Sequence, residues 1–287
     1  MSGAPQVAVV TDSTAYLPVA VIDRYGLTVV PLQVVLDGRV GTEGAQVTPA
    51  DVAAALDHRR AKVSTSRPPP MAFLAAYDDA AKATGVTDIV SVHLSGELSG
   101  TVASARLAAA EVAPRLRVRV VDSRSTAMGL GFAVMAAAAA AATGAGLAAV
   151  EQAAVEQAAR TSSLFYVATL EHLRRGGRLG AAAALVGSAL AVKPILHVVD
   201  GRIAPLAKVR TASKALARLE ELAVEAAGDG PVELAVHHLA APQKAGQLAD
   251  RLRYRIAGAT EVYVSEVGAV VGAHVGPGLL GVVIARR

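Results

Sequence analysis

Val92-His-Leu-Ser-Gly-Glu-Leu-Ser-Gly-Thr-Val102 is the stretch that decides the fold expected for this chain. An apolar run, Ile89 to Leu94, leads into this loop, and a strong helix former, Val102 to Ala110, leaves it. The first N–H groups of a helix lack partners and the helix dipole is positive there, so such a loop suits an anion. It has no lysine, which excludes a P-loop and favours a singly charged carboxylate. The alternative is that Ser99 and Thr101 only cap the helix.

The composition excludes several classes of protein. The chain has 287 residues, of which 53% are hydrophobic and 3% aromatic, and it contains no cysteine, so thiolate and disulfide chemistry are excluded. A net charge of +4 is too small to indicate nucleic-acid binding. No basic signal-peptide region precedes Val7, and we expect a cytoplasmic protein. Residues 125–150 are uncharged, but their alanine and glycine content predicts buried helices rather than a membrane span.

The first half of the chain alternates between strand and helix signals. This alternation predicts a doubly wound parallel sheet in an N-terminal α/β domain, residues 1–160. A Thr48-Pro49 pair predicts a helix start, and Ser64 to Pro70 reads as a stiff loop. Strands are expected at Val7–Val10, Thr28–Leu36, Ile89–Leu94 and Leu116–Val121, and helices at Pro18–Tyr25, Ala50–Arg59, Met71–Ala83 and Ala127–Ala142.

The second half has adjacent strands without helices between them. This pattern predicts a C-terminal α+β domain with a mixed sheet, residues 161–287. Asp200-Gly201 is a strong hairpin signal between two strands. The expected strands are Leu164–Leu170, Ile195–Val199, Ile203–Arg210, Val232–Leu239, Glu261–Val267 and Leu279–Ala285, and the expected helices are Ala181–Leu190, Ala212–Ala226 and Gln243–Ile256.

Three polar loops follow strands of the predicted parallel sheet. They begin at Thr11, Ser95 and Asp122. Ligands of such sheets bind beyond the carboxyl ends of the strands, so we expect the three loops to converge there.

Two further segments carry polar side chains in constrained loops. In Gly272-Ala-His-Val-Gly-Pro-Gly278 one histidine stands among glycines, which allow a ligand to approach closely. The alternative is a hairpin turn with a solvent-facing histidine. Leu173-Arg-Arg-Gly-Gly-Arg178 concentrates guanidinium groups that suit a carboxylate or phosphate, with a solvated turn or a protein-docking patch as alternatives.

Several enzyme templates fail on this sequence. His237 and His238 alternate in a strand pattern and cannot chelate one metal together, and we expect no metal site. A serine hydrolase would need Ser95 or Ser99 with His274 and Asp122, but no Gly-x-Ser-x-Gly elbow is present. A nucleotide-dependent enzyme is a third and remote alternative, because the Walker lysine motif is absent.

Seven segments occur in a fixed order, and the match covers essentially the whole chain. They are Thr11–Thr14, Thr65–Pro68, Ser95–Thr101, Val121–Ser123 before Met128–Gly131, Leu173–Arg178, Lys193–Leu196 and Gly272–Gly278. Each is weak alone, but the ordered set resembles the DegV family of bacterial fatty-acid-binding proteins. The resemblance implies a two-domain α/β protein that buries a long-chain fatty acid between its domains, without a cofactor, metal or catalytic residue.

The resemblance also implies a partner and a set of site residues. A separate fatty acid kinase subunit would use ATP to phosphorylate the bound carboxylate to an acyl phosphate for phospholipid synthesis, and transient contact with a membrane surface is compatible with this role. Thr65, Ser95 and His274 would hold the carboxylate, with the Gly96 N–H and Arg174 beside them. The head-group network or kinase docking would use Arg175, Arg178, Asp12, Ser13, Asp122 and Ser123. The family often has serine at position 96 and glutamine at position 67, where this chain has Gly96 and Arg67.

Overall fold

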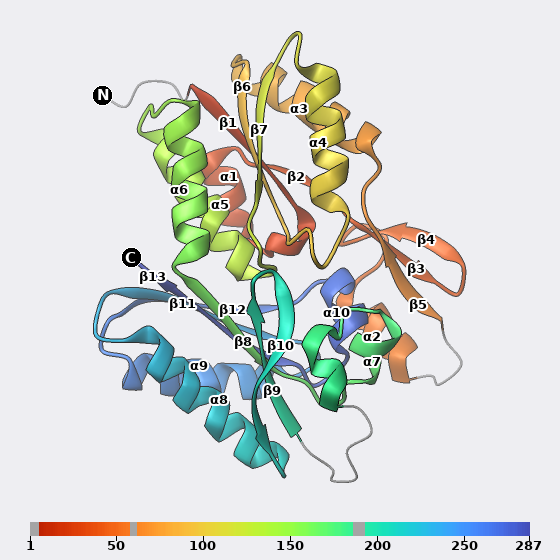
Figure 1. The fold of residues 1–287 in the computed structure, drawn as a ribbon, viewed down its shortest axis with the longest axis vertical. Helices are drawn as coiled ribbons and strands as arrows, with labels where there is room; N and C mark the ends of the chain where they lie inside the picture. The colour runs from red at the N-terminus through yellow and green to blue at the C-terminus, as the bar shows by residue number, and fades with distance from the viewer. Residues whose placement is uncertain (1–5, 58–61, 186–192) are drawn as a thin grey trace. The chain divides into compact units, whose positions relative to one another are not determined.

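The computed structural model describes residues 6–57, 62–185 and 193–287 (Figure 1). The chain forms two compact units. The first contains Met1–Leu32 and Ser66–Ala159, and the second contains Gln33–Thr65 and Arg160–Arg287. The second unit therefore includes residues 33–65, which differs from the predicted division of a continuous chain at residue 160. The physical reason is that these residues pack against the helix that carries His274.

The first unit is built on a parallel four-stranded sheet in the order β2-β1-β6-β7. Its strands are β1 (Val7–Asp12), β2 (Thr28–Val30), β6 (Asp88–His93) and β7 (Arg117–Asp122). The register places Val9 opposite Val90 and Ser91 opposite Val120. The parallel order confirms the predicted sheet and places the three polar loops after β1, β6 and β7.

Helices cover both faces of this sheet, as a doubly wound fold requires. On one face, α3 (Pro70–Thr84) and α4 (Thr101–Val112) bury Phe73, Tyr77 and Ala105 against Ala8 and Val10. The helices α5 (Met128–Ala142) and α6 (Leu147–Ala159) contact β1, β6 and β7. The short segments η1 (Ser13–Ala15) and α1 (Val19–Tyr25) follow β1.

The uncharged run of residues 125–150, for which buried helices were predicted, contains the largely buried α5 and the first four residues of α6. Gly144 has a φ of 82°, a left-handed conformation that ends the first helix and suits glycine. At Gly131 an added Cβ would lie 2.8 Å from the Ala15 carbonyl oxygen, so the close packing of α5 on η1 requires glycine. Within the described ranges, no helix combines the length and apolar character that crossing a bilayer requires.

Residues 33–65 form a small three-stranded sheet in the order β4-β3-β5 with one helix. The elements are β3 (Gln33–Leu36), β4 (Arg39–Thr42), α2 (Pro49–Asp57) and β5 (Val63–Ser66). The prediction of one strand over residues 28–36 was wrong, because the chain leaves the parallel sheet at Pro31, which has no N–H for a ladder. Ser64 to Ser66 lie in β5, so the predicted loop begins only after that strand.

Local signals explain the hairpin turn and the helix start within residues 33–65. Asp37 and Gly38 have φ values of 48° and 84°, as a two-residue hairpin turn requires. Thr48 accepts a hydrogen bond from the Asp51 N–H at 3.2 Å, and Asp51 accepts one from the Thr48 N–H at 2.9 Å. This reciprocal pair caps the start of α2.

The second unit has a six-stranded mixed sheet in the order β10-β9-β8-β13-β11-β12. Among the strand pairs of this sheet that the structure describes, only β11–β12 is parallel, which confirms the predicted α+β arrangement. Its strands are β8 (Thr161–Tyr166), β9 (Lys193–Val199), β10 (Arg202–Val209), β11 (Val232–His238), β12 (Ala259–Glu266) and β13 (Leu280–Arg286). The part of the predicted helix 181–190 that the structure describes belongs to a 3-10 helix, η2 (Gly180–Leu185), and its remainder lies outside the described residues.

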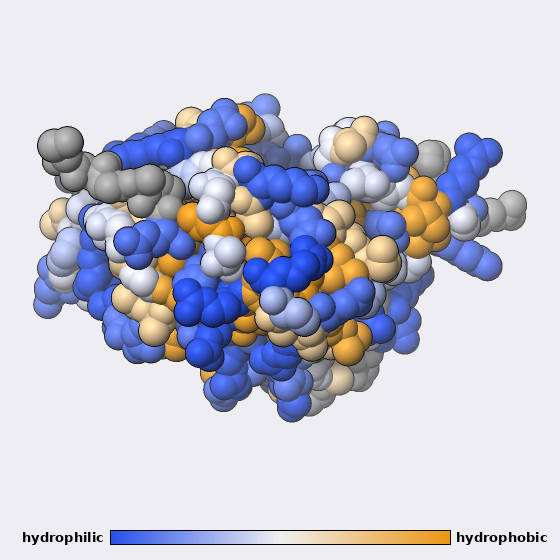
Figure 2. Space-filling model, turned by 90° about the horizontal axis from the view of Figure 1, so that it is seen from above, coloured by the Kyte–Doolittle hydropathy of each residue, from blue (hydrophilic) through white to orange (hydrophobic). Residues whose placement is uncertain are grey.

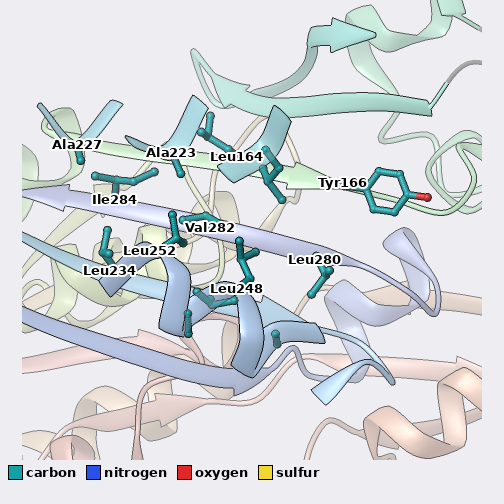
Figure 3. Packing of buried hydrophobic residues seen from close by; sticks show 14 of the residues in the cluster. Leu164, Tyr166, Ala223, Ala227, Leu234, Leu248, Leu252, Leu280, Val282 and Ile284 are labelled. Carbon is teal, nitrogen blue, oxygen red and sulfur yellow. The ribbon is translucent and has the colours of Figure 1, made fainter. Parts of the chain in front are cut away.

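The helices α8 (Ala212–Ala227) and α9 (Pro242–Arg255) complete the core of this unit. Figure 3 shows Leu164 and Val282 of the sheet near Leu248 and Leu252 of α9. Burying one such side chain stabilises a fold by about 1.5–3 kcal/mol. The face drawn in Figure 2 shows apolar residues interspersed with hydrophilic ones, an ordinary protein surface.

Candidate functional site

Thr65 and His274, which are 209 residues apart in the chain, meet in the second unit. Thr65 lies on β5 and His274 in the last turn of α10 (Ala269–Val275), and Thr65 Oγ1 is 2.8 Å from His274 Nε2. The prediction of a loop over 272–278 was therefore wrong up to Val275. The helix ends at Gly276, whose φ of 73° suits glycine, and only then does the loop begin.

The His274 imidazole is held neutral at neutral pH. Burial, and to a lesser degree the positive charge of Arg178, lowers its pKa to about 4. Its Nδ1 is buried and has no hydrogen-bond partner within the described part of the chain. When Nε2 carries the proton, the ring donates to Thr65 Oγ1 and orients the hydroxyl hydrogen outward. The pair can then donate a hydrogen bond to an anion without a formal positive charge on the imidazole.

Two glycines lie against two histidine rings and fix their positions. A Cβ on Gly176, which follows α7 (Glu171–Arg175), would overlap His274 Nδ1. A Cβ on Gly276 would overlap the ring of His172, which lies on α7. His274 of α10 therefore packs against Gly176, which follows α7, and His172 of α7 packs against Gly276, which follows α10. His172 was not identified from the sequence, and the glycines around His274 were expected to allow a ligand to approach closely rather than to pack against histidine rings.

The three arginines of the basic segment have different surroundings. Arg174 makes two hydrogen bonds with Glu171, at 2.8 and 2.9 Å, and Arg175 makes one at 2.8 Å. These bonds, chiefly from Arg174, lower the pKa of Glu171 to about 2. Arg178 donates to the Gly176 carbonyl, and its charge acts on His274. Arg178 is therefore the arginine whose charge lowers the pKa of the imidazole. Arg174, in contrast, is exposed and paired with Glu171.

The Ser95 loop belongs to the first unit, and its backbone donors are already used. Ser95 is fully buried, its N–H donates to the Ser125 carbonyl at 2.8 Å, and its Oγ accepts from the Glu97 N–H at 3.2 Å. The Gly96 N–H donates to Asp122 Oδ2 at 3.1 Å. Asp122 therefore occupies the Gly96 N–H in this structure, and the head-group role of that N–H stays a prediction.

Asp122 and Ser123 bind the backbone of their own loop. Asp122 Oδ1 accepts from the Arg124 N–H at 2.8 Å, and Ser123 Oγ accepts from the Ser125 N–H at 3.2 Å. The alternative that Ser99 and Thr101 only cap the helix after the Ser95 loop is also not confirmed. Helix α4 begins after Gly100 without a side-chain cap, and the hydroxyls of Ser99 and Thr101 bond each other at 2.8 Å.

Asp12 organises a buried polar network that the sequence analysis missed. Its Oδ2 lies 3.0 Å from His93 Nδ1 and accepts from the Leu94 N–H at 3.0 Å. His93 Nε2 is 2.6 Å from Ser91 Oγ, which accepts from the Tyr77 hydroxyl at 3.0 Å. Burial raises the pKa of Tyr77 to about 12. The available signal was the period-two spacing of Ser91 and His93 within a buried strand.

This network has the residue types of a hydrolase triad but lacks access to a substrate. Ser91 and His93 are completely buried, and Ser91 Oγ is already bonded on both sides. Asp12 also accepts from the Thr14 N–H and hydroxyl, and Ser13 Oγ accepts from the Leu32 N–H at 3.0 Å. Asp12 and Ser13 therefore stabilise the loop after β1, which gives no support for a docking role.

Comparison with known sequences shows similarity along nearly the whole chain. A family model described as "Uncharacterised protein, DegV family" matches residues 6–287. A DegV domain-containing protein of Streptomyces coelicolor is 57% identical over 281 residues, which cover 98% of this chain and 99% of the relative. Protein DegV of Bacillus subtilis is 35% identical over 278 residues, covering 96% of this chain and 98% of that protein.

Solved structures show the same fold. A protein of Thermus thermophilus, described under "Fatty Acid Binding of a DegV family Protein", has a TM-score of 0.91 at 33% identity and covers 98% of this chain and 100% of its own. The B. subtilis structure, described as a fatty acid binding protein, has a TM-score of 0.89 at 33% identity, with coverages of 98% and 99%.

Proposed function

This chain belongs to the DegV family, and we propose that it binds a long-chain fatty acid whose carboxylate is held by Thr65 and His274. The observation that carries the proposal is the 2.8 Å Thr65–His274 pair, in which a neutral ring protonated at Nε2 leaves the hydroxyl hydrogen free to donate to a carboxylate. The structural relatives described as fatty acid binding proteins support the class of ligand.

The alkyl tail and the head group of a fatty acid should contribute very different amounts to the free energy of binding. Burying an alkyl chain contributes about 0.8 kcal/mol per CH₂, so sixteen carbons contribute on the order of 12 kcal/mol before binding costs. A hydrogen bond to a charged group contributes roughly 1.5–3 kcal/mol. The tail should therefore set the affinity, and the Thr65–His274 pair should set the position of the carboxylate.

The proposal extends to what happens to the bound acid. This chain would present the carboxylate to a separate fatty acid kinase subunit in the cytoplasm and would not catalyse the transfer itself. The exposed guanidinium groups of Arg174 and Arg175, which are partly neutralised by Glu171, suit an acidic docking surface on such a partner. Ser95 is a further proposed head-group residue, assigned from sequence alone.

Mass spectrometry of an organic extract of the purified chain tests the first step. We expect nearly equimolar fatty acid, and a chain purified from lipid-containing cells without any would contradict the proposal. The variant Thr65→Val keeps the shape of the side chain but removes the hydroxyl. It should retain the lipid and lose one hydrogen bond of roughly 1.5–3 kcal/mol to the carboxylate.

The kinase step has its own test. With a kinase subunit and ATP, Ser95→Ala should still carry fatty acid but give much less acyl phosphate, because the tail dominates binding. Normal turnover by this variant would show that Ser95 has no role at the head group. A fluorophosphonate probe that labels Ser95 stoichiometrically would instead favour the hydrolase alternative.

A further inference from the structure

Helix α10, which carries His274, begins without a capping side chain of its own. Its N-cap residue is Gly268, and the helix spans only Ala269–Val275. The first N–H groups of a helix have no partners within it, and a helix of this length is not stable by itself. Contacts from elsewhere in the second unit must therefore hold α10 in place.

Glu43 caps this helix from a distant part of the sequence. Its Oε1 accepts a hydrogen bond from the Val270 N–H at 2.8 Å, across 227 residues of chain, and the Glu43 side chain is buried. A carboxylate at this end also complements the positive end of the helix dipole. The turn after β4 fixes Glu43, because the N–H groups of Gln46 and Val47 both donate to the Thr42 carbonyl.

The first and last turns of α10 are coupled. Val270 and His274 are four residues apart, so they lie on the same face, about 6 Å apart along the axis. Between them, a Cβ on Gly272 would lie 3.8 Å from Val52 Cγ1 of α2. Residues 33–65 therefore contact α10 near its start through Glu43, through the packing of helix α2, and near its end through the Thr65–His274 hydrogen bond.

We infer that Glu43 is a positioning residue for the Thr65–His274 pair. By fixing the start of α10, its carboxylate sets the direction in which the His274 imidazole points toward Thr65. Glu43 acts through the helix, and no contact between Glu43 and the ligand is needed. The consequence for fatty acid binding rests on the function proposed above, whereas the effect on the imidazole does not.

The experiment compares three variants of the full chain. Glu43→Ala removes the cap, Glu43→Gln keeps an oxygen that can accept from the Val270 N–H, and Thr211→Ala removes an unrelated cap in the same unit. Thr211 Oγ1 accepts from the Lys214 N–H at the start of α8, so its loss is a matched control. The measurements are the melting temperature, the pH titration of the His274 ring by NMR, assigned with His274→Gln, and the dissociation constant for palmitate.

We expect Glu43→Ala to raise the His274 pKa toward its ordinary range, because a loosened α10 exposes the ring. Palmitate binding should weaken by about ten- to a hundredfold, the equivalent of one hydrogen bond to a charged carboxylate. Glu43→Gln should restore both properties. Thr211→Ala should lower the melting temperature but leave the His274 titration as in the wild type.

Two results would overturn the inference. One is a His274 titration that is the same in Glu43→Ala as in the wild type, and the other is an equal disturbance in Glu43→Gln or Thr211→Ala. If Glu43→Ala does not fold, Glu43→Asp takes its place, since its carboxylate is one methylene too short. A wild-type chain that binds no palmitate would contradict the proposed function alone, because the ring titration needs no ligand.

Discussion

Replacing Gly176 with alanine isolates the contact that positions the His274 ring. Gly176 has a φ of −73° and a ψ of −8°, values that alanine adopts without strain. Alanine even has the better helix propensity, by about 1 kcal/mol. Its Cβ, however, would overlap His274 Nδ1. A loss of stability in this variant would therefore come chiefly from the ring, because the nearest backbone atom, the His172 carbonyl oxygen, would lie 3.2 Å from the added Cβ.

The expected magnitude follows from two costs and one gain. Overpacking costs about 1–3 kcal/mol, and losing the 2.8 Å bond to Thr65 costs about 0.5–1.5 kcal/mol more. Against these stands the propensity gain of about 1 kcal/mol. We expect Gly176→Ala to lower the free energy of unfolding by about 0.5–3.5 kcal/mol and to displace the NMR signals of the His274 ring.

Urea denaturation and NMR on a small set of variants measure this effect. Gly177→Ala is the matched control, because Gly177 has a φ of 69° but no atom within 4 Å of an added Cβ. It should destabilise the fold by backbone strain and leave the His274 signals in place. In a His274→Ala background, Gly176→Ala should be neutral or stabilising by up to about 1 kcal/mol, since the overlap is gone. A loss as large in that background as in the wild type would refute the reasoning.

Two further predictions concern buried polar groups. The folded-state pKa of His274 is about 4, below its usual 6.5, so its contribution to stability is complete above pH 6.5 and is lost as the pH falls through 4. Denaturation curves at a series of pH values should therefore show that acid lowers the free energy of unfolding by about 3 kcal/mol less in His274→Asn than in the wild type. The same pH dependence in both proteins would contradict a buried neutral ring. Asp12→Asn should lower the free energy of unfolding by about 2–5 kcal/mol, because it leaves up to two buried donors facing an amide N–H₂; a loss below 1 kcal/mol, measured in urea, would show that the network can rearrange.

Much of the fold could be predicted because the signals are local. Alternating apolar runs, an Asp-Gly turn at 200–201 and a Thr-Pro helix start at 48–49 need no knowledge of distant contacts. The parallel and mixed sheets, and most of their strands, were identified in this way. The errors occurred where local pattern and tertiary context disagree: Pro31 separates two strands of different sheets, and α10 includes residues that were predicted to form a glycine-rich loop.

The candidate site was only partly visible in the sequence. Thr65 and His274 were both identified, and the structure brings them within hydrogen-bonding distance. Asp12, Asp122 and Ser123 were also identified, but they bind the backbone of their own unit. Glu43 and His172 were missed because a single polar residue in an ordinary context carries no spacing that predicts its partner. His93 was missed although its period-two spacing from Ser91 was a signal.

The sequence by itself determined the elements, the order of polar loops after strands, and the family, since each is recorded in residues close together in the chain. Only the tertiary structure decided that residues 33–65 join the second unit and contact α10 through Glu43, helix α2 and Thr65. Those contacts depend on side chains up to 227 residues apart, and no periodic pattern relates positions so distant. A buried polar group can bind a ligand or a backbone group of its own chain. Which of the two it binds depends on the atoms that lie within hydrogen-bonding distance, and only the folded chain determines those.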